Sequence, residues 1–537
     1  MKQDQIETIL SVSRPVGFSG AGDSYLPPLI VSLKQMLYRL KKKIDLPACC
    51  FDSYHLEMLA MVLVEFSEDI HNDIGIWRSL EYYNEKFFGI RLPLTTEPNE
   101  AVTPEGFDPL RIRHLLWKTL HELEPALIIS PKHLGVRLMA EKTSLFLTKR
   151  FQEIPQDSGI KKFLSGPNRH GWEIKNKLIW LGVNSYLLRL CIDNYVANLV
   201  PDAQLDDPPI AVEDDFIYQE CTQWSGLGAV ELLAQALDLT DADRQTLLSW
   251  RERHTAVYRV LSRSCKAGEP RTITVLNLIN DKTYTTLTEM ADCPFQRDQI
   301  VSGNLVPWRN YWCWTGVQEI WGRHDEQMIK RIRRDFLERR TAISYRYCPE
   351  LAKKARETAR SYHEHFISYH GSDLVVHPDG RATAAAMEQM MLAQYQKVSA
   401  NELAQIMKDH GFSQPTPYTQ FPPELLQNCH GLGTFSTPDE GPETMIEFNV
   451  LTAGMAKKGI GLTEDEVYAI RGFIDSPAIS VAFVRRLAKE YGAASIGAAY
   501  FIREFNDTGD LEYMLRCHKG HFYQKRYPAF GFAQLEQ

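Results

Sequence analysis

The side chains best suited to chemistry lie in two segments that combine positive charge with aromatic rings. The denser segment is 516–526, which contains no acidic residue. Positive charge neutralises phosphates and aromatic faces stack on unpaired bases, so this mixture is typical of single-stranded nucleic-acid sites. The alternative is a C-terminal segment that docks on an acidic protein surface. The candidate binding residues in this segment are Arg516, His518, Lys519, His521, Tyr523, Lys525 and Arg526.

The second basic segment is 323–340, where apolar residues such as Ile329, Ile332 and Phe336 recur at helical spacing. Its basic residues alternate with acidic ones, and Arg331 and Arg334 are the candidate binding residues. The alternative is the solvated face of an amphipathic helix.

A group of histidines could bind a metal ion. Zinc proteases place two histidines at i and i+4, so that both face one metal. Ile367 occupies that position after His363, and His365 does not share a helical face with His363 and His370. Surface or capping histidines are therefore the favoured interpretation, and no metal site is predicted.

Other catalytic sets are incomplete. Asp439, Glu443 and Glu447 could hold Mg²⁺, but no lysine accompanies them at a nuclease-like spacing, so an exposed acidic loop is favoured. Cys517 has basic neighbours that would favour its thiolate, but nothing identifies a catalytic partner. The sequence contains no GxxxxGK[ST] phosphate loop, and no cofactor is expected.

The composition is that of an ordinary globular protein. The chain has 537 residues, of which 44% are apolar and 24% charged, and its length predicts three or four domains. A net charge of −8 argues against wholesale binding of nucleic acid, although a local basic patch is compatible with it. Ten cysteines without a CxxC pair indicate reduced thiols in the cytoplasm. No signal peptide or membrane anchor is recognised.

The pattern of apolar residues predicts a mainly α (α+β) protein, in which helical N- and C-terminal regions flank a small five-stranded β module. Residues 1–200 are expected to form a helical domain. Residues 201–215 are expected to form a linker, because they are acidic and Pro208-Pro209 cannot continue a helix.

Residues 216–410 are expected to hold the β module, preceded by a helix at 230–248 and followed by further helices. Turn residues separate five short segments rich in β-branched and aromatic residues, which predicts a strongly curved sheet or barrel between about 255 and 320. Barrels of this size bind nucleic acid in some proteins and only join helices in others. The five segments are 255–263, 271–279, 283–290, 298–306 and 310–320.

The C-terminal part begins with residues 411–445, which contain six prolines and four glycines and are expected to form a long loop. Residues 446–537 return to a helical pattern. Within them, Thr463 is predicted to cap a helix, with Glu466 three positions later as its partner.

Two stretches resemble a bacterial family that is known only as a domain of unknown function. The first is 108–195, with Pro155-Gln156-Asp157-Ser158-Gly159 among its motifs, and the second is 483–528, which includes Leu515-Arg516-Cys517-His518. Separately, residues 303–316 are similar to a small β module of other uncharacterised bacterial proteins. The resemblance implies a bacterial, cytosolic protein and carries no activity, cofactor or catalytic residue.

The leading hypothesis is a non-enzymatic binding or scaffold protein of the cytoplasm, which presents basic-aromatic surfaces to nucleic acid or to another protein. The alternative is a metal-dependent hydrolase, whose site would be assembled from distant histidines and acidic residues. A third interpretation is a purely architectural role within a complex. No membrane partner is expected.

Overall fold

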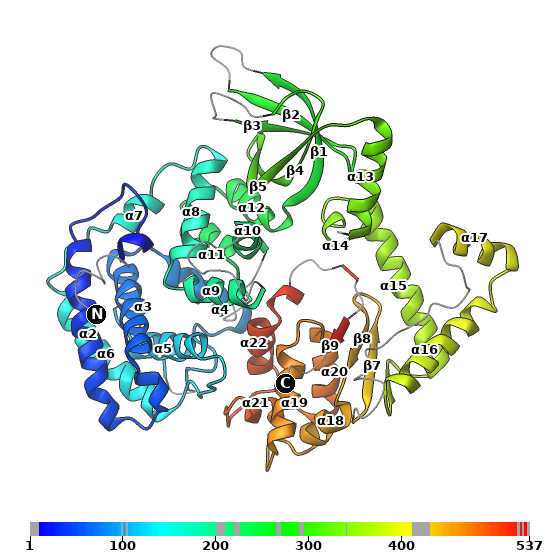
Figure 1. The fold of residues 1–537 in the computed structure, drawn as a ribbon. Helices are drawn as coiled ribbons and strands as arrows, with labels where there is room; N and C mark the ends of the chain where they lie inside the picture. Colours follow the sequence, from blue (N-terminus) through cyan, green and yellow to red (C-terminus); the bar gives the residue numbers. More distant parts are fainter. Residues whose placement is uncertain are drawn as a thin grey trace. The chain divides into compact units, whose positions relative to one another are not determined.

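The structure is a computed structural model that divides the chain into two compact units, Met1–Cys348 and Pro349–Gln537 (Figure 1). We call them the N-terminal and the C-terminal unit. The mainly helical fold with a small five-stranded β module is confirmed, while the division falls at none of the predicted domain boundaries. The residues that the structure describes are 10–97, 100–103, 106–199, 210–219, 226–264, 270–288, 295–339, 341–410, 430–523, 527–528 and 531–533.

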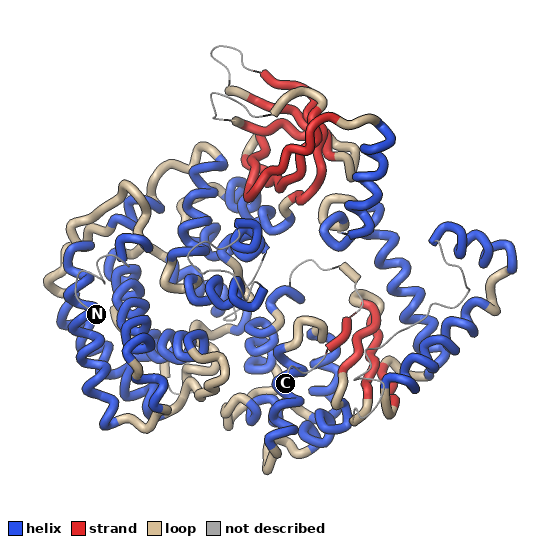
Figure 2. The backbone as a smooth tube through the Cα atoms, in the orientation of Figure 1, coloured by secondary structure: helices blue, strands red, loops and turns tan. Residues whose placement is uncertain are grey.

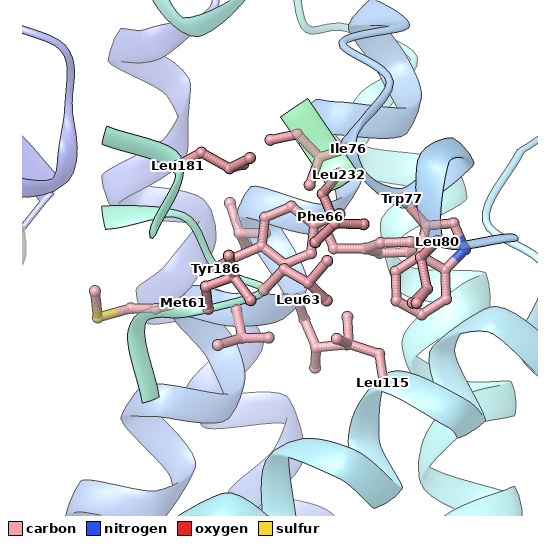
Figure 3. Packing of buried hydrophobic residues seen from close by; sticks show 14 of the residues in the cluster. Met61, Leu63, Phe66, Ile76, Trp77, Leu80, Leu115, Leu181, Tyr186 and Leu232 are labelled. Atoms are coloured by element: carbon pink, nitrogen blue, oxygen red, sulfur yellow. The ribbon is translucent and has the colours of Figure 1, made fainter. Parts of the chain in front are cut away.

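The N-terminal unit begins with helices packed around one apolar core. Figure 3 shows Phe66, Trp77, Leu115 and Leu181 meeting there from four different helices. The helices are α2 (Leu26–Leu40), α3 (Ser53–Asn72), α4 (Ile76–Phe88), α5 (Pro109–Leu123), α6 (Leu134–Phe151), α7 (Gly159–Leu164), α8 (Gly171–Asn184), α9 (Arg189–Leu199), α10 (Ile210–Gln219), α11 (Ala229–Ala236) and α12 (Asp241–Leu248).

Helix α3 buries carboxylates as well as apolar side chains. Glu68 binds both terminal nitrogens of Arg14 at 2.7 Å, and Glu65 pairs with Arg189 at 2.8 Å. Asp69 accepts hydrogen bonds from the Trp77 backbone nitrogen and the Tyr186 hydroxyl, each at 2.7 Å. Buried charges persist when they are paired and hydrogen-bonded, so these pairs tie distant parts of the helical core together.

The predicted linker at 201–215 is wrong for residues 210–215. Residues 201–209 lie outside the described residues, but α10 begins at Ile210. Asp214 of this helix is buried and paired with the buried Arg253, and it accepts a hydrogen bond from Asn304 Nδ2 at 3.1 Å. Its charge therefore neutralises an arginine instead of solvating a linker.

The prediction of a single helix over 230–248 is also wrong, because two helices, α11 and α12, occupy this stretch. Thr240 lies between them and caps α12, because its hydroxyl oxygen accepts a hydrogen bond from the Asp243 backbone nitrogen at 3.1 Å.

The five predicted strands are present and close into a barrel (Figure 2). Their order is β1-β2-β3-β5-β4, and β3 and β5 pair in parallel while the other pairs are antiparallel. This is the strand order of the OB-fold, the small Greek-key barrel of many oligonucleotide- and oligosaccharide-binding proteins. The strands are β1 (His254–Ser264), β2 (Thr272–Asn277), β3 (Thr283–Leu287), β4 (Gln299–Trp308) and β5 (Tyr311–Arg323).

Helix α13 (Glu326–Arg339) covers one side of the barrel, and a short helix α14 (Thr341–Ser344) follows it. Ile329 of α13 packs against Val257 and Ile300, as the amphipathic pattern predicted. Because strand side chains alternate, Tyr258 points to the opposite face from Val257, into the barrel, where its ring contacts Trp314 with centroids 5.3 Å apart.

The C-terminal unit combines helices with a sheet of order β6-β7-β8-β9, whose core includes stacked Phe435 and Phe483. The capping box at Thr463 and Glu466 is confirmed. Its elements are α15 (Pro349–His370), β6 (Leu374–His377), α16 (Gly380–Tyr395), α17 (Ala400–His410), β7 (Leu432–Thr437), β8 (Gly441–Met445), α18 (Phe448–Ala456), α19 (Glu464–Asp475), α20 (Val481–Tyr491), α21 (Ala494–Ala499), α22 (Gly509–His518) and β9 (Gly531–Ala533).

The long loop predicted at 411–445 is therefore wrong in its C-terminal part, where β7 and β8 form a hairpin. Residues 411–429 lie outside the described residues. Within the part of the chain that the structure describes, no helix is both long enough and apolar enough to cross a membrane.

Candidate functional site

The basic segment 516–526 is largely built into the C-terminal unit. Lys519 is fully buried, and its Nζ donates to the carbonyl oxygen of Ser476 at 2.7 Å. His518 Nδ1 lies 2.8 Å from Asp475 Oδ1. Burial alone would raise the pKa of Asp475, but the charge and hydrogen bond of His518 hold it below its usual value. Both basic residues thus stabilise this unit.

The Tyr523 ring of the same segment is covered by protein. The Arg516 guanidinium lies over the Tyr523 ring, 4.2 Å from its centroid, and the Tyr523 hydroxyl donates to Glu512 Oε2 at 2.8 Å. His521 Nε2 lies 3.4 Å from the carbonyl oxygen of Pro477. Lys525 and Arg526 lie outside the described residues. A ring already stacked on a guanidinium offers less surface to a base.

Arg331 and Arg334 lie on the exposed side of α13, with side chains 67% and 65% exposed. Each is paired with Asp335, Arg331 at 3.8 Å and Arg334 at 3.2 Å. This is the geometry of a solvated helix face. It belongs to the N-terminal unit, whereas 516–526 belongs to the C-terminal unit.

The candidate metal ligands have separate partners. His363 Nδ1 lies 3.3 Å from Ser436 Oγ, and His365 Nε2 lies 2.8 Å from the carbonyl oxygen of Met390. His370 instead packs against His377, with ring centroids 6.4 Å apart. Among the described residues, no three histidine, cysteine or acidic side chains come together where they could hold a metal ion.

The acidic candidates near 439–447 also differ in their partners and in their burial. Glu443 is buried, and its Oε2 accepts a hydrogen bond from the Ser480 backbone nitrogen at 2.7 Å. Burial raises the pKa of Glu443 to about 7. Glu447 instead pairs with His430 at 2.7 Å, and Asp439 is exposed.

Cys517 is buried, and burial raises the pKa of its thiol. The thiolate that its basic neighbours were expected to favour is therefore disfavoured.

The best-formed basic-aromatic site is a pocket of about 460 Å³ at one end of the barrel. It lies where the end of β3, the β4–β5 turn, the residues before β2 and the residues before α8 meet. None of the described residues that line it is acidic. The lining residues are Arg169, His170, Pro270, Arg271, Leu287, Thr288, Trp308, Arg309, Asn310 and Tyr311.

The β4–β5 turn places two rings and a guanidinium at the pocket. Trp308 and Tyr311 pair across the turn, so both flank Arg309 and Asn310. Arg309 has a φ of 53°, a left-handed conformation that costs a residue with a Cβ about 1–2 kcal/mol. Two hydrogen bonds to Asp243 of α12, at 2.9 and 3.2 Å, hold the guanidinium and with it the turn.

The residues that precede α8 lie beside the turn, because the carbonyl oxygen of Arg169 accepts a hydrogen bond from Arg309 Nη1 at 3.4 Å. The backbone nitrogens of Arg169 and His170 donate to Glu173 Oε2 at 2.6 and 2.9 Å, which fixes their course at the start of the helix. Both side chains are exposed. Glu173 therefore sets the backbone that carries Arg169 to the pocket.

Among the described residues that line the pocket, Trp308 is the buried one. Its side chain is buried, yet its Nε1 meets no acceptor among the described residues. The indole packs edge-on against the buried Trp250, with ring centroids 6.0 Å apart, so Trp308 belongs to the packed interior beneath the pocket.

The lining includes none of the seven predicted site residues that the structure describes. Its three arginines, Arg169, Arg271 and Arg309, are far apart in the sequence, so no local cluster marked them. The available signal was the pair of aromatic residues on either side of Arg309-Asn310, at the predicted gap between the last two strands.

The fold and the pocket together describe a helical protein with an OB-type barrel and a basic-aromatic pocket. Residues 14–215 match the family described as a protein of unknown function (DUF3843). The match includes the predicted stretch 108–195 and ends before 483–528. No curated protein and no solved structure matches the chain. The matched region contributes Arg169 and His170 to the pocket, and the barrel contributes the rest.

Proposed function

We propose that this protein is a non-enzymatic binding protein that holds single-stranded nucleic acid at the barrel pocket. The observation that carries the proposal is that Arg169, Arg271 and Arg309, from separate parts of the chain, line one pocket together with the partly exposed ring of Tyr311. Guanidinium groups bind phosphate oxygens, and aromatic faces stack on bases, so the lining matches both halves of a nucleotide.

The position of the pocket supports the same ligand. OB-folds bind oligonucleotides and oligosaccharides with the face of β2 and β3 and with the β1–β2 and β4–β5 loops. Here Leu287 ends β3, Arg271 precedes β2, and Arg309 forms the β4–β5 turn. A neutral oligosaccharide would use the Tyr311 ring but not three arginines, so charge favours the nucleic acid.

The test is fluorescence anisotropy of the full chain with a labelled single-stranded oligonucleotide of about 15 nucleotides, long enough for one OB-type site. Binding is expected at low salt. If three phosphates are contacted, the logarithm of the binding constant should fall against the logarithm of salt with a slope of about −2.

The matched variants are Arg271→Ala and Arg297→Ala. Both arginines belong to the barrel, but Arg297 is 78% exposed and does not line the pocket. Arg271→Ala should weaken binding roughly tenfold, since a hydrogen bond to a charged group contributes about 1.5–3 kcal/mol. Arg297→Ala should bind like the wild type. A folded wild-type protein that binds no oligonucleotide at low salt would refute the proposal, as would equal weakening by the two variants.

A further inference from the structure

Helices of the N-terminal unit close one side of the barrel pocket. Lys175 of α8 donates from Nζ to the carbonyl oxygen of Trp314 at 3.3 Å, and the indole nitrogen of Trp250 donates to the carbonyl oxygen of Pro307 at 2.6 Å. Gly171, at the start of α8, is packed so tightly that a Cβ there would meet Trp308 Cβ at 3.1 Å and clash with the thiol of Cys313. No strand of nucleic acid can pass between these helices and the ends of β4 and β5.

A hydrogen-bonded bridge closes the same side at the turn. Arg309 binds Asp243 of α12 through Nε and Nη2, and its Nη1 donates to the carbonyl oxygen of Arg169 at 3.4 Å. One side chain thus connects the β4–β5 turn, α12 and the residues before α8. The pocket is bounded there by protein atoms that hold one another in place.

We infer that the pocket takes the end of a nucleic-acid strand, a terminal nucleotide with its phosphate, and does not take an internal segment. The inference rests on the proposed function. A volume of about 460 Å³ lies in the range of pockets that enclose one small molecule. A strand that continued in both directions would need an opening on both sides, and one side is closed.

The charge of the lining favours a terminal phosphate. An internal phosphodiester carries one negative charge, whereas a terminal phosphate carries about two at neutral pH and offers three acceptor oxygens. Arg169, before α8, and Arg271, before β2, bring two guanidinium-bearing side chains to the lining from different segments of the chain.

The experiment is a competition in which unlabelled strands of one sequence displace a labelled linear strand from the full chain. Four competitors are compared: a strand with a 5′-phosphate, one with a 3′-phosphate, one with hydroxyl groups at both ends, and a covalently closed single-stranded circle. One of the two phosphorylated strands should compete roughly tenfold better than the hydroxyl strand. The circle should be the weakest competitor.

The outcomes separate this inference from the proposed function. If all four strands compete equally, the protein binds internal segments, so the inference is wrong and the proposed function stands. If the labelled strand itself does not bind, the proposed function has failed.

Two variants test whether the pocket causes the preference. Arg169→Ala and Arg271→Ala should each bring the phosphorylated strand close to the hydroxyl strand, while Arg297→Ala keeps the preference. Circular dichroism confirms folding, and the exposed position of Arg169 makes that variant informative even if Arg271→Ala unfolds. A preference for the terminal phosphate that survives in a folded Arg169→Ala variant would overturn the assignment to this pocket.

Discussion

The C-terminal segment 516–526 and the barrel pocket contain the same kinds of side chain and use them differently. In the segment, Lys519 and His518 satisfy Ser476 and Asp475, and Arg516 covers the ring of Tyr523. In the pocket, the exposed Arg169 and Arg271 lie beside the Tyr311 ring around an open volume, while Arg309 is held by Asp243. Basic residues that are close together in the sequence can serve to stabilise the fold, while basic residues that are far apart in the sequence can come together at one pocket.

The sharpest way to test this contrast is to remove Lys519. Lys519→Ala should destabilise the C-terminal unit by about 3–5 kcal/mol, because it removes a fully buried side chain and leaves the Ser476 carbonyl oxygen without that donor. Chemical denaturation followed by circular dichroism measures the loss. Lys519→Met is the matched control, since it keeps most of the volume and should lose less. The contrary result is a Lys519→Ala variant that keeps its stability but no longer binds the oligonucleotide. That result would show that the segment 516–526 is a binding site.

The barrel shows how much of the fold can be predicted from the sequence. Its strands are marked by β-branched and aromatic residues between turn residues, which are local signals, and all five were predicted. The prediction of a linker was wrong for residues 210–215 because the partner of Asp214 is Arg253, which is distant in sequence. The acidic residues therefore looked solvated.

The pocket was missed for the same physical reason. Arg169, Arg271 and Arg309 are brought together by barrel closure and by Asp243, which holds the turn. Neither contact has a signature in the local sequence. The burial of Lys519 was equally hidden, since lysine is almost never fully buried unless it is paired.

A second prediction uses the pH dependence of the C-terminal unit. Burial raises the pKa of Glu443 from its ordinary value of 4.5 to about 7, so the folded state holds this proton more tightly than the unfolded state. The stabilisation is complete below pH 4.5 and is lost as the pH rises to about 7, by up to about 3 kcal/mol. Glu443→Gln, which stays neutral, should flatten this part of the stability profile.

Denaturation midpoints between pH 4.5 and 7 check this second prediction, with Asp439→Asn as an exposed control. A flattened profile in Glu443→Gln would show that a titrating group of the C-terminal unit acts on folding stability alone. This result would sharpen the contrast with the barrel pocket. If the slope is the same in Glu443→Gln and the wild type, the titration belongs to another group.

A third prediction concerns the rings of the pocket. Tyr311→Ala should weaken oligonucleotide binding about tenfold, within the range of 1–3 kcal/mol for loss of one stacked base. Tyr311→Phe should bind like the wild type, because the ring and not the hydroxyl makes the stack. Anisotropy at one salt concentration compares the three proteins. Weakening by Tyr311→Phe as large as that by Tyr311→Ala would indicate a hydrogen bond in place of stacking.

The smallest expected effect belongs to the second predicted basic segment. The double variant Arg331→Ala/Arg334→Ala removes two charges that are exposed and paired with Asp335, so both folding stability and oligonucleotide binding should change little. Binding should fall by less than about twofold, and the remaining change should vanish at high salt because exposed charges are screened. The same anisotropy assay measures it beside Arg271→Ala. If the double variant weakens binding as much as Arg271→Ala does, α13 contributes to the nucleic-acid surface. The ligand would then extend along the barrel, beyond the pocket.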